Sequence, residues 1–349
     1  MKAVGLLSGG LDSALALKLI KDMGVEVVAV KFTSPLCQRD SVDDGHAALV
    51  AQEMGIELKT IAKDVAFLEM IRHPKHGYGS ALNPCIDCRI FMLKHARILM
   101  EEIGASFIIT GEVLNQRPMS QYRRAMDMVE KEAGVEGLLV RPLSAKHFAP
   151  SDAEKNGWID REKLLALEGR GRRPQLDLAK QLGMKNFASP AGGCLLTDRS
   201  FASKLRDMFR NKTVVSMHDV GILKVGRHYR VGADKVISGK DNGQCKALRA
   251  LAKPGDWVFD PMSDKGALVL LQKDQADAEA LANAAPIAAA KITPASEPVD
   301  SFDFAARLSA AYSDGDSEFV TISARQKGGE ARELKVKREE RDTFKYWKL

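Results

Sequence analysis

The sequence lacks the two patterns that mark membrane-spanning and exported proteins. No apolar run approaches the length of a membrane span, and the N-terminus has no signal-peptide pattern. We therefore expect a cytoplasmic protein with no membrane partner. Long internal repeats are also missing, and the 349 residues, 45% hydrophobic and 28% charged, predict two or three globular domains.

Cysteine is scarce and the excess of positive charge is small. Five cysteines in a long chain without secretory features argue for metal or redox chemistry rather than structural disulfides. There are 52 lysines and arginines against 46 aspartates and glutamates, which gives a net charge of +6. This balance fits a polyanionic partner, but only weakly.

The loop SGGLDS at residues 8–13 lacks the marks of two common nucleotide-binding motifs. It has neither the lysine of GxxxxGK[ST] nor the spacing of GxGxxG. It separates an apolar run at residues 2–7, which predicts a buried strand, from residues 11–23, whose apolar side chains recur at helical spacing. Glycines that let the backbone approach an anion, followed by a helix N-terminus, outline a nucleotide-phosphate site. The plainer alternative is a turn in which Ser or Asp only caps the helix.

After this loop, strands and helices continue to alternate. The patterns predict strands at 25–32, 56–61, 107–110 and 138–143, and helices at 41–55 and 91–103. The alternation predicts an α/β fold with a doubly wound parallel sheet, in which ligands lie at the carboxyl ends of the strands. Gly111 follows one of these strands and is therefore a further candidate for the nucleotide site.

Three cysteines form a candidate sulfur or metal site: Cys85 and Cys88 in NPCIDCR, and Cys194 in SPAGGC. The CxxC precedes the predicted helix 91–103, where the helix dipole and Arg89 are expected to lower the pKa of a thiol. Three thiolates can hold a [4Fe–4S] cluster and leave one iron open to sulfide. Alternatively, Cys194 carries a persulfide that Cys88 resolves as a disulfide, or the thiols bind zinc with a nearby histidine.

SGGLDS resembles the SGGxDS loop of the PP-loop ATP pyrophosphatases, which adenylate a carbonyl oxygen and release pyrophosphate. SGGLDS, NPCIDCR and SPAGGC, in this order and in one α/β domain, are similar to the tRNA thiouridine synthetases of the MnmA/TrmU and ThiI types. The resemblance covers about residues 1–205. It implies that a uracil oxygen is adenylated and that sulfur then displaces AMP.

The resemblance also implies roles for individual residues. ATP would bind at Ser8, Gly9, Gly10, Asp12 and Ser13, with Mg²⁺ offsetting the phosphate charge and Asp12 as a candidate to hold it. Cys85, Cys88 and Cys194 match the three-cysteine pattern of the cluster-dependent members. Members that work by persulfide keep two cysteines, which correspond to Cys88 and Cys194, so the extra Cys85 favours the cluster route and a [4Fe–4S] cofactor. Asp12, Cys88 and Cys194 are thus the expected catalytic residues.

The C-terminal part consists of short strand-like segments split by Gly, Asn-Gly and Pro-Gly turns. Residues 230–261 resemble an NFACT-R-type RNA-binding module, which implies RNA binding. Basic residues there suit phosphate contacts, and Tyr229 and Trp257 suit stacking on unpaired bases. The alternative is a β-rich appendage with a solvated basic face. Residues 274–292 are Ala-rich and predict a helix, and residues 318–338 predict a hairpin.

Together these patterns predict a PP-loop catalytic domain at residues 1–205, an RNA-binding region at 206–292, and a linker, helix and basic hairpin at 293–349 that extend it. The expected function is ATP-dependent tRNA sulfurtransfer, with tRNA and a sulfur donor as partners, the donor being sulfide or a cysteine desulfurase relay. One alternative is a PP-loop enzyme that amidates its substrate. The other is an RNA-binding or Fe–S protein that binds a nucleotide without turnover.

Overall fold

The computed structural model describes residues 1–36, 44–188, 194–262, 266–273 and 299–349. The chain divides into two units, Met1–Thr197 and Asp198–Leu349. The expected boundary after residue 205 falls inside helix α8 (Arg199–Asn211), which starts the second unit. Within the described ranges no helix is long and apolar enough to cross a membrane.

The first unit is built on a parallel sheet of five strands in the order β3-β2-β1-β4-β5. The predicted doubly wound α/β fold is therefore confirmed. The strand order reverses between β1 and β4, which is where ligands bind in such folds. The strands are β1 (Lys2–Leu6), β2 (Glu26–Thr33), β3 (Glu57–Ala62), β4 (Phe107–Ile109) and β5 (Leu139–Val140).

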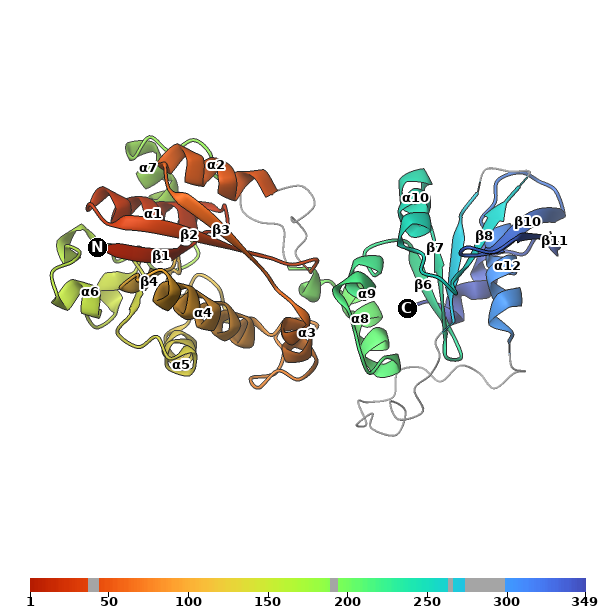
Figure 1. Ribbon diagram of the computed structural model, residues 1–349, viewed down its shortest axis with the longest axis horizontal. Coiled ribbons are helices and arrows are strands. Elements are labelled where there is room, and N and C mark those ends of the chain that lie inside the picture. The colour runs from red at the N-terminus through yellow and green to blue at the C-terminus, as the bar shows by residue number, and fades with distance from the viewer. Residues whose placement is uncertain (37–43, 189–193, 263–265, 274–298) are drawn as a thin grey trace. The chain divides into compact units, whose positions relative to one another are not determined.

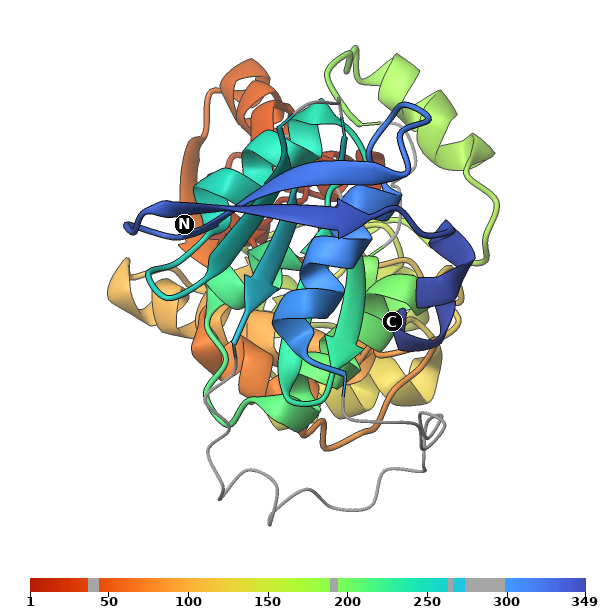
Figure 2. The ribbon, with the colours of Figure 1, turned by 90° about the vertical axis from the view of Figure 1, so that its right-hand side faces the viewer.

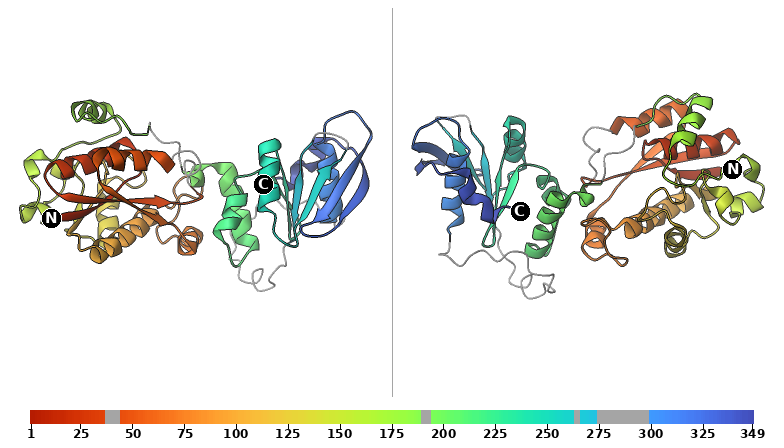
Figure 3. Two further views of the ribbon diagram at one scale, coloured as in Figure 1. Left: turned by 45° about the horizontal axis from the view of Figure 1, so that its top comes forward. Right: turned by 180° about the vertical axis from the view of Figure 1, so that it is seen from behind.

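Helices cover both faces of this sheet, as Figures 1 and 3 show. One hydrophobic cluster joins the sheet to α1, α2 and α7, and a second joins it to α4 and α5. The two clusters take alternate residues of β1, Ala3 and Val4, as expected for a strand buried on both faces. The helices are α1 (Leu11–Asp22), α2 (Asp44–Met54), α3 (Val65–Arg72), α4 (Cys85–Glu102), α5 (Arg123–Ala133), α6 (Asp152–Lys155) and α7 (Arg173–Gln181), with short 3-10 turns at Ala145–His147, Arg161–Lys163 and Leu195–Thr197.

The second unit is an antiparallel sheet of six strands in the order β11-β10-β8-β9-β7-β6. Helix α12 packs on one face of the sheet (Figure 2), and residues of α9 and α10 pack on the other. The strands are β6 (Arg227–Val231), β7 (Asp234–Ser238), β8 (Trp257–Pro261), β9 (Val269–Gln272), β10 (Phe319–Gln326) and β11 (Ala331–Lys337). Besides α8, the helices are α9 (Met217–Ile222), α10 (Asn242–Leu251), α12 (Ser301–Ala311) and a 3-10 helix at Arg341–Trp347.

The expected role of Tyr229 in base stacking is wrong. Its side chain is 1% exposed, and its hydroxyl lies 3.3 Å from that of Tyr312 inside the core under α12. Trp257 is half-buried, with its ring 5.0 Å from that of Phe302. The predicted hairpin is confirmed as β10 and β11, and the helix predicted at residues 274–292 lies outside the described residues.

Candidate active site

The loop between β1 and α1 leaves a helix N-terminus without a side-chain cap. Gly10 is the N-cap residue, and no described side chain accepts a hydrogen bond from the first turn of α1. Ser8 and Ser13 instead bond within the loop: the Ser13 hydroxyl donates to the Gly10 carbonyl at 2.9 Å and lies 3.1 Å from the Ser8 hydroxyl. The plainer alternative, in which Ser or Asp caps the helix, therefore does not hold. N–H groups without a side-chain cap and the positive end of the helix suit an anion.

Gly111 lies directly against this loop. A Cβ atom at Gly111 would lie 2.5 Å from the carbonyl carbon of Asp12 and 2.5 Å from the backbone nitrogen of Ser13. Only a glycine lets the end of β4 approach the phosphate loop so closely. The prediction that Gly111 belongs to the nucleotide site thus has a geometric basis, namely backbone contact rather than a side-chain contact.

We expect the Gly111→Ala substitution to displace the phosphate loop. Overpacking of this kind costs about 1–3 kcal/mol of stability, and the displaced loop is expected to lose affinity for ATP. Isothermal titration and thermal melting measure both effects. Gly45→Ala in α2 is the matched control, because nothing lies within 4 Å of a Cβ atom there. Equal ATP affinity in the two variants would contradict the role of Gly111.

Asp12 faces a polar group from the loop after β4 and a basic residue from the start of α7. Its Oδ2 atom accepts a hydrogen bond from Gln116 Nε2 at 2.9 Å and lies 3.7 Å from the Arg172 guanidinium. Asp12 Oδ1 and Gln116 Oε1 are buried and have no hydrogen-bond partner among the described residues. Two unpartnered oxygens beside a phosphate loop are the ligands that Mg²⁺ prefers, so this donor set fits the expected cation.

Arg117 lies in the loop after β4 and is an exposed residue. Desolvation of its guanidinium and the neighbouring Arg89 lower the pKa of Arg117, whereas the charges of Asp12 and Cys85 act in the opposite direction. With Arg172 beside Asp12, two guanidinium groups accompany the carboxylate that the sequence predicts to be catalytic.

Glu112 anchors a third guanidinium at the same edge of the sheet. Its carboxylate is 2% exposed and lies 3.5 Å from Arg89 and 3.1 Å from Arg141. Burial alone would raise the pKa of Glu112, but Arg89 and Arg141 hold it below the ordinary value. The carboxylate is therefore charged and fixes Arg89 on the first turn of α4, next to Cys88.

The CxxC lies in the first turn of α4, not before the helix as expected. The Cys88 amide donates to the carbonyl of Pro84, the N-cap residue, at 2.8 Å. Burial and the nearby Cys88 raise the pKa of Cys85, and these effects outweigh the opposing charges of Arg89 and Arg117. The expected lowering of the pKa by the helix end and Arg89 is thus wrong for Cys85.

Lys63 contacts the second cysteine. Its ammonium group lies 3.7 Å from Cys88 Sγ and 4.4 Å from the centre of the Phe67 ring, and the residue is 8% exposed. Lys63 follows β3, so the parallel sheet brings it to the same edge as the phosphate loop. Sequence reasoning missed this residue, because a single lysine after a strand belongs to no motif.

The backbone brings Cys194 toward the CxxC. Leu195 donates to the Leu36 carbonyl at 3.2 Å, and Leu82, three residues before Cys85, donates to the Leu196 carbonyl at 3.0 Å. On the other side of the residues that are not described, Ala188 donates to the Gly9 carbonyl in the phosphate loop at 2.9 Å. Ala188 thus lies at the phosphate loop, and Leu195 and Leu196 lie near the residues before the CxxC. Residues 189–193 of SPAGGC and Cys37 lie outside the described residues.

The three cysteines do not present a ready metal site. Across the described part of the chain, no group of three or more His, Cys, Asp or Glu side chains is placed to hold a metal ion. The residues present therefore do not fit a preformed three-thiolate cluster site. They do not fit a zinc site either, and His76 lies 3.1 Å from Glu132 instead.

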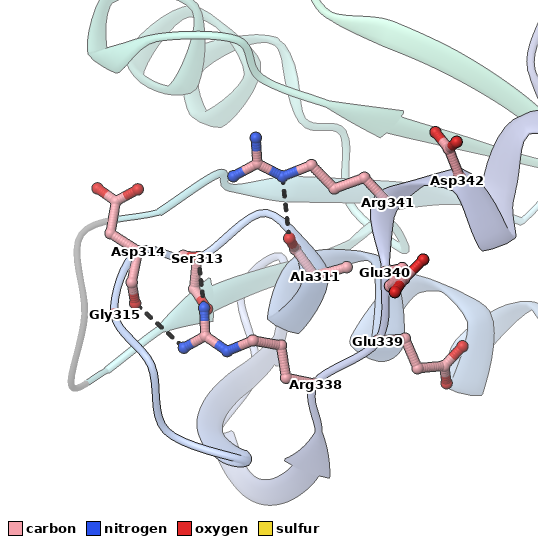
Figure 4. A pocket seen from close by; sticks show the side chains of 9 residues that line it. All are labelled: Ala311, Ser313, Asp314, Gly315, Arg338, Glu339, Glu340, Arg341 and Asp342. Atoms are coloured by element: carbon pink, nitrogen blue, oxygen red, sulfur yellow. Dashed lines mark hydrogen bonds between the residues drawn. The ribbon is translucent and has the colours of Figure 1, made fainter.

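A hollow in the second unit lies at the C-terminal end of α12 (Figure 4). Its two arginines form hydrogen bonds with backbone carbonyl groups. Arg338 donates to the carbonyls of Ser313 and Asp314 at 2.7 and 3.1 Å, and Arg341 donates to the Ala311 carbonyl at 3.2 Å. These bonds satisfy carbonyl groups at the helix end. The hollow is accordingly a structural feature of the helix terminus.

The strand order, the uncapped loop and the Gly111 contact thus place an anion-suited loop at the switch point of a parallel α/β sheet. Residues 1–146 match the family model described as "Thiamine biosynthesis protein (ThiI)". This match covers less than half of the chain and places the similarity in the first unit.

Curated relatives match the same region. The tRNA-specific 2-thiouridylase MnmA of Pelobacter propionicus is 31% identical over 118 residues, which are 32% of this chain and 33% of the relative. A probable tRNA sulfurtransferase of Thermococcus kodakarensis is 33% identical over 116 residues, 33% of this chain and 30% of the relative. The chain thus matches about a third of the length of these relatives. Among solved structures, a 4-thiouridine synthetase–RNA complex with bound ATP gives a TM-score of 0.36 at 21% identity, covering 64% of this chain and 52% of that chain. A similarity of this size supports no functional conclusion.

Proposed function

We propose that the protein is an ATP-dependent tRNA sulfurtransferase that replaces a uridine carbonyl oxygen with sulfur. The observation that carries the proposal is that Ala188 bonds to Gly9 in the phosphate loop, while Leu196, two residues after Cys194, bonds to Leu82 beside the CxxC. A nucleotide on the phosphate loop and a sulfur on the cysteines would then meet at one site. The ThiI-type domain and the thiolating relatives support the same assignment.

The phosphate loop would bind ATP through Ser8, Gly9, Gly10, Asp12 and Ser13. Asp12 Oδ1 and Gln116 Oε1 are the oxygens available to Mg²⁺, which would offset the negative charge of the phosphates when bound. The uracil oxygen would attack the α-phosphorus, and pyrophosphate would leave. Arg117 and Arg172 are positioned to stabilise the charge that develops on the departing pyrophosphate.

The sulfur step would use Cys194 and Cys88. The terminal sulfur of a Cys194 persulfide would attack the adenylated carbon, and AMP would leave with the former carbonyl oxygen. The Cys88 thiolate would then attack Cys194 Sγ, which leaves the sulfur on the nucleoside and forms a Cys88–Cys194 disulfide. An external thiol would reduce the disulfide, and a persulfide on a cysteine desulfurase relay would then transfer its terminal sulfur to the Cys194 thiolate, leaving the donor as a thiol. The Lys63 ammonium, 3.7 Å from Cys88 Sγ, would stabilise the attacking thiolate.

The alternative sulfur carrier is a [4Fe–4S] cluster on Cys85, Cys88 and Cys194. Among the described residues, no group of three or more His, Cys, Asp or Glu side chains is placed to hold a metal ion. Anaerobic purification followed by iron and sulfide analysis decides between the carriers. About four irons per chain, with broad absorbance near roughly 400 nm, would favour the cluster, whereas iron-free protein with intact thiols would favour the persulfide.

Pyrophosphate release tests the proposed function. We expect the protein to release pyrophosphate from ATP when unmodified tRNA is added, and little without it. A protein that binds nucleotide and RNA without turnover gives no release. An amidating PP-loop enzyme releases pyrophosphate but does not need Cys194, so the Cys194→Ala variant, assayed for modified product, separates it from a sulfurtransferase.

A further inference from the structure

Three lysines of the second unit converge on the start of β6. The Lys204 ammonium, on α8, donates to the carbonyls of Leu223 and Gly226 at 3.3 and 3.4 Å. The Gln244 side chain accepts from the backbone N–H groups of Gly226 at 3.0 Å and Lys240 at 3.3 Å, which ties the turn after β7 to the same glycine. The side chain of Lys204 is therefore bonded to Gly226 directly, and the backbone of Lys240 is linked to Gly226 through Gln244.

Lys348 reaches the same place from the other side. Its backbone pairs with Tyr229 in an antiparallel bridge, and Leu349 donates to the His228 carbonyl at 2.9 Å. Figure 1 shows α8, α9 and β6 side by side, with the C-terminus next to β6. Lys240 and Lys348 are exposed and Lys204 is half-buried. None of the three ammonium groups forms an ion pair with a carboxylate within the described ranges.

We propose that Lys204, Lys240 and Lys348 form a phosphate-binding site whose ligand is the sugar-phosphate backbone of RNA. A cluster of like charges around a half-buried ammonium is unfavourable on its own and becomes favourable when an anion joins it. These lysines mark the surface of the second unit that would contact the substrate. The inference therefore rests on the proposed function, in which that substrate is tRNA. It differs from the sequence-based expectation, because neither Tyr229 nor Trp257 is part of it.

The electrostatics of Lys204 make this site sensitive to pH. Burial, Lys240 and Lys348 lower the pKa of Lys204 to about 8, although Asp198 acts in the opposite direction. The neighbouring His228 stays neutral over this range, because burial and the surrounding lysines hold its pKa well below the ordinary value. An anion favours the protonated lysine, so binding takes up a proton above about pH 8. RNA affinity is therefore expected to fall as the pH rises through 8.

The test measures binding of the full chain to an unmodified tRNA transcript at several pH values and salt concentrations, without ATP. We expect K204Q to lower the affinity about tenfold at low salt, since one charge-assisted hydrogen bond is lost, and to reduce the salt slope by about 1. K204R keeps a charge that does not titrate, so it is expected to bind well with a flat pH profile. K337Q, on β11 at the opposite edge of the sheet, is the control.

The inference is overturned if K204Q binds no worse than K337Q, or if the wild-type profile is as flat as that of K204R. If K204Q unfolds, K240Q replaces it, because Lys240 is exposed and donates only through its backbone. Inorganic phosphate alone is titrated as a second probe. Lys204-dependent binding of phosphate without any effect on RNA would indicate a free-anion site and would also overturn the inference. If K204Q binds RNA normally and the wild-type protein thiolates tRNA, the inference fails while the proposed function stands.

Discussion

Replacing Cys194 by alanine is expected to abolish tRNA thiolation while ATP binding stays unchanged. In the proposed mechanism the transferred sulfur is bonded to Cys194, and a loss of at least about 10³-fold is typical when a nucleophile is removed. Ala188 donates to the Gly9 carbonyl through its backbone, a bond that does not involve the Cys194 side chain. Thiolated nucleoside is measured after digestion of the tRNA, and ATP binding is measured by isothermal titration.

Cys245→Ala is the matched control for this experiment. Cys245 lies on α10 in the second unit, where its sulfur accepts a hydrogen bond from the Leu268 amide at 3.4 Å. This variant is expected to thiolate tRNA at the wild-type rate. Retained thiolation by the Cys194 variant would exclude both sulfur mechanisms, because the cluster and the persulfide each require this cysteine.

The Asp12→Asn substitution is expected to slow pyrophosphate release by about 10²–10³-fold, the loss typical when one preorganised electrostatic contact to a transition state is removed. Asparagine preserves the shape of Asp12 and an acceptor oxygen for Gln116, but it removes the negative charge that faces Arg172 and would hold Mg²⁺. Excess Mg²⁺ is expected to recover part of the rate. Pyrophosphate release in the presence of tRNA is the measurement.

Asp22→Asn, at the other end of α1, is the control for Asp12. Asp22 is exposed and pairs with the half-buried Lys18 on the same helix, a contact worth little. Binding of tRNA is expected to be the same in both variants. If Asp12→Asn lost tRNA affinity but kept pyrophosphate release, the assignment of the nucleotide site to the first unit would be contradicted.

Much of the first unit could be predicted from the sequence, because short apolar runs and helical spacing alternate there without ambiguity. The expected strand at residues 2–7 and helix at 11–23 agree with β1 and α1 to within one residue at each end. The contact of Gly111 with the phosphate loop follows from the strand order, which places the ends of β1 and β4 side by side.

Other features depend on three-dimensional neighbours that no local pattern encodes. The pKa of Cys85 is set by burial and by Cys88, whereas the sequence shows only the helix end and Arg89. Tyr229 lies among basic residues in the sequence of β6, which suggested a role in RNA binding. In the structure its side chain packs in the core with residues of α12. Lys63 follows β3 and Cys88 lies on α4, and only the folded structure brings the two side chains to 3.7 Å.

The measurement that tests the central claim most directly is nucleoside analysis of tRNA after incubation with the protein. Unmodified tRNA is supplied with ATP, Mg²⁺, a thiol reductant and sulfide or a cysteine desulfurase with cysteine, and the digested nucleosides are identified by mass spectrometry. The account predicts a uridine in which one oxygen is replaced by sulfur, formed only with ATP and lost in the Cys194→Ala variant. Pyrophosphate release without any thiolated nucleoside, under either sulfur donor, would contradict it.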